Sequence, residues 1–415
     1  MKVPATIAIK LSKAAERAVK QGHPWVFEKS IEKKPDKKAL AGSLCVIFDR
    51  RTNKPIAFGL WDPEEIIRIK IIFKGVGLQL NVDFWKSQLK NAHVKREKLI
   101  EHSINGYRGI HGENDGFPGL ILDVYAQVGV LKIYSEIWKP YLDVLITEMQ
   151  NQFALKTIVI RFSRKIAQRN TFSFQEGDVI GEELPIEKVG FDEYGVRFFA
   201  YTKSGHKTGF FLDQRPNRLW VQKNANGKKV LDVFSYVGGF GIHALKGGAQ
   251  SLTSIDISSQ AMEVAAENVA INHLDEKKWT PLVVDAFVAL DDLIKQKAQF
   301  DIVIIDPPSF AKQASEVPYA LKQYERLARL GKELLAKNGT LILGSCSSRI
   351  TLEEFEEVHK SAKLTEFNGW KYLHTTLHDE DHPIAFPESN YLKTIFYQKV
   401  SLLSDKSNKR AFQSL

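Results

Sequence analysis

The chain has 415 residues, of which 44% are hydrophobic and 26% are charged, a composition typical of a globular protein with two or three domains. Its apolar runs are all shorter than the roughly 20 residues of a membrane-spanning helix. Charges interrupt the first 20 residues, so we expect neither a membrane anchor nor a secretory signal. The two cysteines, Cys45 and Cys346, lie far apart, which predicts a cytoplasmic protein without a disulfide framework.

The net charge of +9 is unevenly distributed along the chain. Residues 1–100 contain 21 Lys and Arg against 10 Asp and Glu, a net charge of +11, so the remainder sums to −2. A basic N-terminal quarter favours a polyanionic partner, most simply nucleic acid. A solvated basic surface would give the same count, so charge alone leaves both interpretations open.

Residues 1–75 are predicted to form a small β-rich domain, with strands near residues 41–49, 55–60 and 66–72. Cys45 falls inside the first of these strands and is interpreted as inert core. This segment resembles the PUA domain, a small barrel appended to RNA-modifying enzymes, through residues 23–27, residues 42–46 and the alternation at 66–72. The resemblance implies RNA binding, although Trp25 and Phe27 would also suit the barrel core.

Residues 80–190 are predicted to form a middle α+β domain without catalytic residues. The pattern favours one helix over residues 83–101, a second over residues 141–153, and strands at 128–134 and 157–162. Four basic residues in and after the last strand could hold RNA or belong to a solvated loop; these are Arg161, Arg164, Lys165 and Arg169.

Residues 196–400 are predicted to form an α/β domain with a mostly parallel, Rossmann-like sheet. Strands are expected at residues 229–233, 251–256, 280–284, 300–305 and 340–344, and helices at 259–273, 288–296 and 321–335. Right-handed crossovers place the carboxyl ends of parallel strands at one edge of the sheet. Polar or reactive side chains follow these strand ends; they are Asp232, Asp256, Asp285, Asp306 and Cys346.

The turn after the first of these strands predicts the cofactor. It contains Phe234, Ser235, Gly238 and Gly239, but no third glycine at the spacing that a dinucleotide fold uses for pyrophosphate, and Asp232 ahead of it would repel phosphate. S-adenosylmethionine carries an ammonium, a sulfonium and a ribose, and no phosphate. Carboxylates suit these groups: Asp232 near the amino-acid end, Asp256 on the ribose hydroxyls and Asp285 near the adenine amine. We therefore expect S-adenosylmethionine as the cofactor and no metal.

The run Asp306-Pro307-Pro308-Ser309-Phe310 follows the fourth of these strands. Because proline lacks an N–H, the loop offers mainly acceptors, which suit an amine-bearing base that stacks on Phe310. The alternative is that the two prolines only end the strand with a rigid loop and have no role in binding a substrate.

Cys346 lies just past the fifth strand, among hydroxyl groups. Carbon 5 of a pyrimidine is a poor nucleophile, and its methylation requires a thiolate that first adds to carbon 6. Cys346 is a candidate for this role; a passive small residue beside the cofactor is the alternative.

Over nearly its whole length the chain resembles the bacterial 23S ribosomal RNA cytosine-5 methyltransferases of the RlmI type, which combine a PUA-like start, a middle α+β domain and a class I methyltransferase. The resemblance is carried by residues 206–215, 234–240, 306–310, 345–347, 382–384, 387–388 and 391–393. It implies that Gln214 and Arg215 line the cofactor pocket, with Arg215 meeting the methionine carboxylate, and that Cys346 is the nucleophile. Related enzymes on this scaffold methylate guanine nitrogens through the Asp-Pro-Pro loop without a thiol, which remains the alternative. The sequence leaves the oligomeric state open, with a homodimer as one option.

Overall fold

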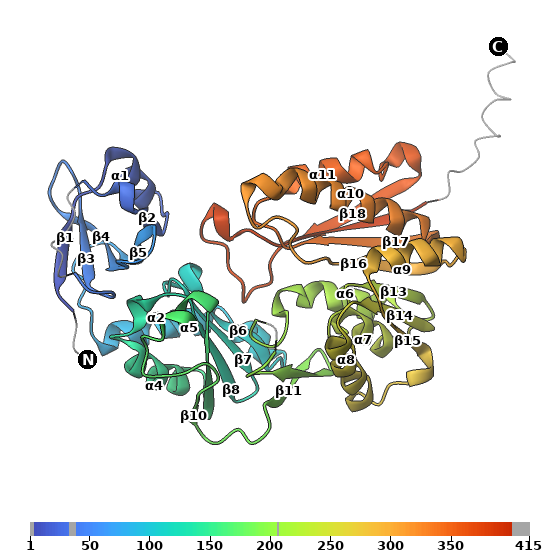
Figure 1. Ribbon diagram of the computed structural model, residues 1–415, viewed down its shortest axis with the longest axis horizontal. Helices are drawn as coiled ribbons and strands as arrows, with labels where there is room; N and C mark the ends of the chain where they lie inside the picture. The colour runs from blue at the N-terminus through green and yellow to red at the C-terminus, as the bar shows by residue number, and fades with distance from the viewer. Residues whose placement is uncertain (1–3, 33–38, 206, 401–415) are drawn as a thin grey trace, which may run out of the picture. The chain divides into compact units, whose positions relative to one another are not determined.

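The structure, a computed structural model, describes residues 4–32, 39–205 and 207–400 (Figure 1). These residues form two compact units. Unit 1 ends at Arg215 and also includes a later segment, residues 378–390, which we call the strap. Unit 2 runs from Pro216 to Leu377 and resumes at Tyr391. His206, within one of the recognised motifs, lies outside the described residues.

The first sheet of unit 1 confirms the expected β-rich domain at the start of the chain. Its strands, in the order β1-β3-β4-β5-β2, are β1 (Thr6–Ile9), β3 (Leu44–Phe48), β4 (Pro55–Trp61), β5 (Ile67–Lys74) and β2 (Trp25–Phe27). Helix α1 (Lys13–Lys20) follows Ser12, whose side chain accepts a hydrogen bond from Ala15 N. Cys45 is fully buried in this sheet, and burial raises the pKa of its thiol, so it is inert core as expected.

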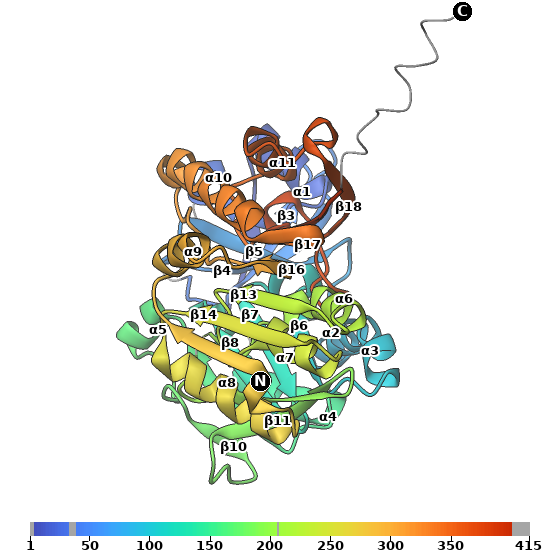
Figure 2. The same ribbon diagram turned by 90° about the vertical axis from the view of Figure 1, so that its right-hand side faces the viewer.

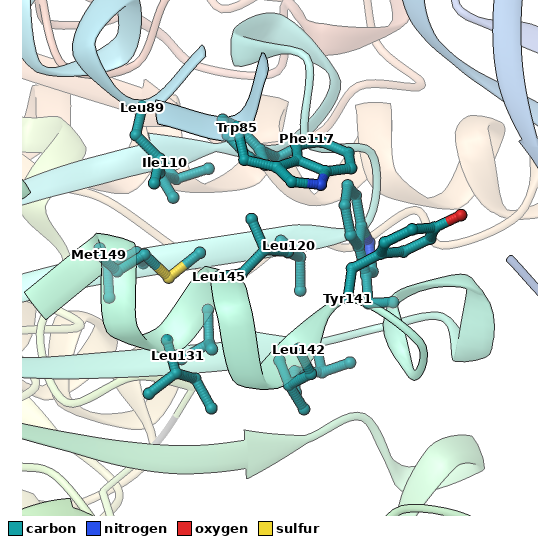
Figure 3. Packing of buried hydrophobic residues seen from close by; sticks show 14 of the residues in the cluster. Trp85, Leu89, Ile110, Phe117, Leu120, Leu131, Tyr141, Leu142, Leu145 and Met149 are labelled. Atoms are coloured by element: carbon teal, nitrogen blue, oxygen red, sulfur yellow. The ribbon is translucent and has the colours of Figure 1, made fainter. Parts of the chain in front are cut away.

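The second sheet of unit 1 is covered by helices. Its order is β10-β9-β8-β7-β6, with β6 (Gly106–His111), β7 (Leu120–Tyr125), β8 (Val128–Ile133), β9 (Thr157–Phe162) and β10 (Val179–Gly181). Side chains of α2 (Val82–Val94) and α4 (Leu142–Gln152) pack onto it, as Figure 3 shows for Trp85, Leu145 and Met149. The remaining helices of this region are α3 (Glu97–Glu101) and α5 (Arg164–Arg169).

The single helix predicted over residues 83–101 is wrong, because α2 and α3 are separate. Arg96 lies between them, is fully buried, and its Nη2 is 2.6 Å from a carboxylate oxygen of Asp115. A buried ion pair formed 19 residues away in sequence is invisible to helical periodicity. The hairpin β11 (Lys188–Glu193) and β12 (Val196–Tyr201) completes the strands of unit 1.

Unit 2 is built on a seven-stranded sheet, in the order β15-β14-β13-β16-β17-β19-β18. The five strands from β15 to β17 in this order are parallel to one another. Strand β19 runs antiparallel to both β17 and β18. The strands are β13 (Lys229–Val233), β14 (Ser251–Asp256), β15 (Trp279–Val283), β16 (Phe300–Ile305), β17 (Leu335–Ser345), β18 (Trp370–Thr376) and β19 (Lys393–Lys399). This confirms the predicted α/β class.

Helices cover both faces of this sheet (Figures 1 and 2). One group comprises α6 (Arg215–Asn224), α7 (Gly239–Lys246) and α8 (Ser259–Ile271), and the other α9 (Ala286–Lys295), α10 (Val317–Glu333) and α11 (Leu352–Ser361). The apolar strands of the sheet are therefore buried on both sides, as parallel sheets require. Within the described part of the chain, none of the helices is both long and apolar enough to cross a membrane.

Candidate active site

The strand register of unit 2 brings the predicted carboxylates to one edge of the sheet. Val233 is paired with both Ile255 and Ile305, so the ends of β13, β14 and β16 lie side by side. Asp256 is the last residue of β14, and Asp306 follows β16 directly. This is the edge at which open α/β sheets bind ligands.

The turn after β13 has an unusual backbone. Phe234 and Tyr236 have φ angles of 63° and 51°, and Gly238 has a φ of 81°. Left-handed conformations at two non-glycine residues are costly and concentrate at ligand sites. At Gly241 a Cβ would lie 2.7 Å from Leu252 Cδ2, so only glycine fits where α7 begins to run beside β14.

Asp232, on the strand that precedes this turn, binds the backbone at the turn's far end. Its side chain is buried, and one carboxylate oxygen accepts a hydrogen bond of 2.9 Å from Gly241 N. Burial raises the pKa of Asp232 to about 7; repulsion from Asp306 and Asp256 adds to this, while the Gly241 N–H acts in the opposite direction. A cationic ligand group nearby would therefore strongly favour the ionised carboxylate.

Asp256 and Asp285 are accessible carboxylates that are already fixed by backbone N–H groups. Asp256 accepts from Tyr236 N at 2.8 Å and from Ser258 N at 2.9 Å. Asp285 is exposed and caps α9 by accepting from the N–H groups of its first turn. A carboxylate has about four acceptor positions, so both retain capacity for a ligand's hydroxyl or amine.

Ser235 and Ile257 complete the surroundings of the turn. Ser235 is buried, with its Oγ 3.5 Å from Met262 Sδ, which favours a structural role for its side chain. Ile257, which sequence reasoning missed, follows Asp256 and is 73% exposed. The signal available in the sequence was an apolar residue directly after an acid-ended strand. Its exposed side chain suits the flat face of a base.

The loop after β16 lies close to the backbone of β17. A Cβ on Gly344 would lie 2.4 Å from an Asp306 carboxylate oxygen, so this glycine makes room for Asp306. Pro307 is buried and Pro308 is exposed. The half-buried Phe310 ring meets Tyr324 edge-on, with 5.2 Å between ring centroids.

Cys346 lies beside this loop, as expected from the topology. It is half-buried, and its Sγ is 3.8 Å from the carbonyl oxygen of Pro307. The hydroxyl groups on either side are occupied: Ser345 Oγ donates to Tyr324 Oη at 3.1 Å, and Ser347 Oγ donates to the carbonyl oxygen of Ala311 at 3.3 Å. The thiol is thus held next to the Asp-Pro-Pro segment.

Gln214 and Arg215 are buried at the end of unit 1. The Arg215 guanidinium is 2.9 Å from an Asp381 oxygen, 3.4 Å from Glu193, and also pairs with Asp379. Its Nη2 donates in addition to the carbonyl oxygen of Gly106. A contact between Arg215 and a methionine carboxylate would require this ion cluster to open.

The residues at the edge suit S-adenosylmethionine chemically. They supply acceptors for its ammonium and hydroxyl groups, a turn without side chains at Gly238 and Gly241, and an exposed apolar residue for its base. Among the described residues, no group of three or more His, Cys, Asp or Glu side chains could hold a metal ion.

The fold and this edge define the class of protein. Residues 168–367 match the family of S-adenosylmethionine-dependent methyltransferases, and residues 9–73 match a PUA-like domain. The chain is an S-adenosylmethionine-dependent methyltransferase.

Curated relatives narrow the family further. The chain is 38% identical to a ribosomal RNA large subunit methyltransferase of Deinococcus radiodurans, covering 96% of this chain and all of the relative. It is 33% identical to ribosomal RNA large subunit methyltransferase I of Shewanella denitrificans, covering 93% of this chain and 98% of the relative. The chain therefore belongs to the family of bacterial ribosomal RNA large subunit methyltransferases.

Solved structures share the fold. A Streptococcus mutans protein described as an S-adenosylmethionine-dependent methyltransferase superposes with a TM-score of 0.79 at 22% identity, covering 94% of this chain and all of that chain. Another methyltransferase, solved in complex with SAH, gives a TM-score of 0.80 at 22% identity, over 95% of this chain and all of that one.

Proposed function

We propose that this protein methylates carbon 5 of a cytosine in large-subunit ribosomal RNA, with Cys346 as a covalent nucleophile. Relatives that align with almost the whole chain are named as large-subunit ribosomal RNA methyltransferases. The observation that carries the proposal is the position of the thiol, 3.8 Å from the Pro307 carbonyl oxygen and beside the loop suited to bind a base.

Each residue has a distinct role in the proposed reaction. Asp306 accepts hydrogen bonds from the exocyclic amine of the cytosine, and Phe310 offers a stacking surface, while Pro307 and Pro308 keep the loop rigid. The Cys346 thiolate forms a bond to carbon 6, which makes carbon 5 electron-rich. Carbon 5 then bonds to the methyl group that the cofactor would supply, and the bond between that methyl group and the cofactor's sulfur breaks. A base then removes the proton of carbon 5, and the carbon–sulfur bond breaks to release the thiolate.

The cofactor supplies an electrophilic methyl group. We propose that the turn at Phe234, Ser235, Gly238 and Gly239 holds its methionine portion together with Asp232. Asp256 and Asp285, through their remaining acceptor positions, would bind the ribose hydroxyls and the adenine amine. The role of Gln214 and Arg215 in the cofactor pocket stays a prediction from the family resemblance.

The thiol mechanism is tested by trapping. RNA containing 5-fluorocytosine has no proton to lose from carbon 5, so the wild-type enzyme should accumulate as a covalent RNA adduct visible by denaturing electrophoresis. Cys346→Ala should abolish both the adduct and methyl transfer. Cys45→Ala is the matched control, because that thiol is fully buried in the first sheet, and it should retain both.

The alternative activity predicts a different pattern. A guanine N-methyltransferase acting through the Asp306 loop would need no thiol, so Cys346→Ala would stay active and no fluorocytosine adduct would form. Mapping the methylated nucleotide by mass spectrometry of digested RNA then identifies the base directly.

A further inference from the structure

Lys393 is a buried lysine that the proposed reaction has not yet used. It begins β19, and its Cα is paired with that of Ser345 at the end of β17, one residue before Cys346. Its side chain is buried, and its Nζ donates to the carbonyl oxygen of Ser347 at 2.7 Å and to that of Ile350. One ammonium thus ties together the loop that carries the candidate nucleophile.

Burying this cation is costly, and the fold retains it in charged form. Burial lowers the pKa of Lys393 to about 8, whereas Cys346, Glu354 and Glu353 act in the opposite direction. The ammonium is therefore mostly protonated at neutral pH. Two of its three donor hydrogens are used on carbonyl oxygens, so it acts through the loop and its charge rather than on a substrate.

The charges around Cys346 show why a cation matters here. Burial raises the pKa of Tyr324 on α10, and the charges of Cys346 and of Asp306, which follows β16, add to this. Glu353 and Glu354 on α11 raise the pKa of Lys393, against the effect of its burial. A lysine next to a cysteine favours the thiolate, because an opposite charge nearby stabilises the ionised form. The interaction between the two charges is reciprocal. Because the Cys346 thiolate stabilises the Lys393 ammonium, the ammonium stabilises the thiolate by the same free energy.

We infer that Lys393 is a positioning residue for the thiol: it fixes the backbone of residues 346–350 and stabilises the thiolate of Cys346. This inference rests on the function proposed above, in which that thiolate is the nucleophile. To that function it adds a residue of the neighbouring strand β19, which activates the nucleophile without touching the RNA.

The test measures how fast iodoacetamide alkylates Cys346 in the full-length protein between pH 6 and 9, by peptide mass spectrometry. Lys393→Met keeps the side-chain length and removes the charge. It should move the midpoint of the alkylation profile upward by about one pH unit and slow alkylation at pH 7 roughly tenfold. Lys393→Arg keeps the charge and should stay close to wild type.

A matched control lies on the same strand. Lys399 is half-buried and its Nζ donates to the carbonyl oxygen of Leu335, at the opposite end of β17 from Cys346. Lys399→Met should leave the alkylation profile unchanged, and calorimetric binding of S-adenosylmethionine should show that all three variants are folded.

The outcomes separate this inference from the proposed function. A folded Lys393→Met protein with the wild-type alkylation midpoint would overturn the inference alone, as would an equal shift in Lys393→Arg. Full methylation by Cys346→Ala would overturn the proposed function instead. In the methylation assay, the expected effect of Lys393→Met is a loss of rate at pH 7 that is partly recovered at pH 8.5.

Discussion

At the scale of single residues, Asp232 shows how burial prepares a site for a charged ligand. Its carboxyl group is buried, close to Asp256 and Asp306, and its pKa is about 7. In the unfolded chain the group would ionise near pH 4. The folded protein without ligand therefore binds this proton more tightly than the unfolded chain does, so this group lowers stability as pH rises from about 4 to 7.

We expect the affinity for S-adenosylmethionine to rise with pH and to level off above about 7. If the cofactor's cationic end lies near Asp232, binding favours the carboxylate and releases a proton below that pH. The affinity should then fall by up to about tenfold for each pH unit below 7. Calorimetry in buffers of different ionisation enthalpy counts the released proton directly.

The variant Asp232→Asn provides the control for this pH dependence. It keeps an acceptor for Gly241 N but cannot ionise, so the slope below pH 7 should disappear and the affinity should be lower at pH 8. If the variant kept the wild-type slope, another group would be responsible for the proton release.

At the scale of elements, the strap links distant parts of unit 1 through buried charges. Its Asp381 is fully buried; it binds Arg215, accepts from Arg108 N at 2.8 Å, and lies 2.7 Å from His382 Nδ1. Although burial opposes ionisation, Arg215 and His382 hold the pKa of Asp381 well below its usual range. This cluster explains why residues 378–390 leave unit 2 between β18 and β19 and join unit 1.

Asp381→Asn should destabilise the protein by about 3–5 kcal/mol, because it removes one partner of a buried charge cluster. Glu380→Gln is the matched control: its side chain is exposed and its nearest ion pair, with Lys98, is 3.7 Å long. That change should cost less than about 1 kcal/mol. Urea unfolding of both variants measures the difference, and equal costs would show that the cluster does not hold the strap.

The elements also show what the sequence could and could not predict. The strands at residues 229–233, 251–256 and 300–305 were predicted with their observed bounds, since each is an apolar run that ends in a polar turn. Strand β18 was missed because it is mostly polar and gains its register only by pairing with β19.

For the candidate site, too, the sequence predicted some features and missed others. Topology placed Asp232, Asp256, Asp306 and Cys346 at one edge, because parallel strands share that edge. The surroundings of Arg215 and Lys393 could not be predicted, because their partners are set by tertiary packing. Asp381 lies 166 residues after Arg215, and Lys393 lies 46 residues after Ser347.

At the scale of the molecule, the two sheets of unit 1 share one hydrophobic core. Leu60 and Ile72 of the first sheet are buried in the same cluster as Trp85 and Trp138. Tyr141 also donates a hydrogen bond of 2.7 Å to the carbonyl oxygen of Gly42. Removing residues 1–75 would therefore expose the core of the second sheet, so a deletion cannot isolate the contribution of the PUA-like domain to RNA binding.

Charge neutralisation on α1 tests the proposed RNA docking without disturbing this core. Lys13 and Arg17 are exposed on successive turns of the helix. If they contact phosphates, the double change Lys13→Gln and Arg17→Gln should weaken RNA binding by about tenfold at 0.1 M salt and reduce the salt dependence by up to about two released counterions. Cofactor affinity should not change.

A second pair of exposed lysines controls for the loss of net charge. Lys277 and Lys278 precede β15, at the edge of the parallel sheet opposite the candidate site. Changing both to Gln removes the same charge from unit 2. If RNA binding depends only on overall charge, the two double variants will weaken it equally. A loss confined to the α1 variant, measured as the slope of log affinity against log salt, assigns the phosphate contacts to the PUA-like domain.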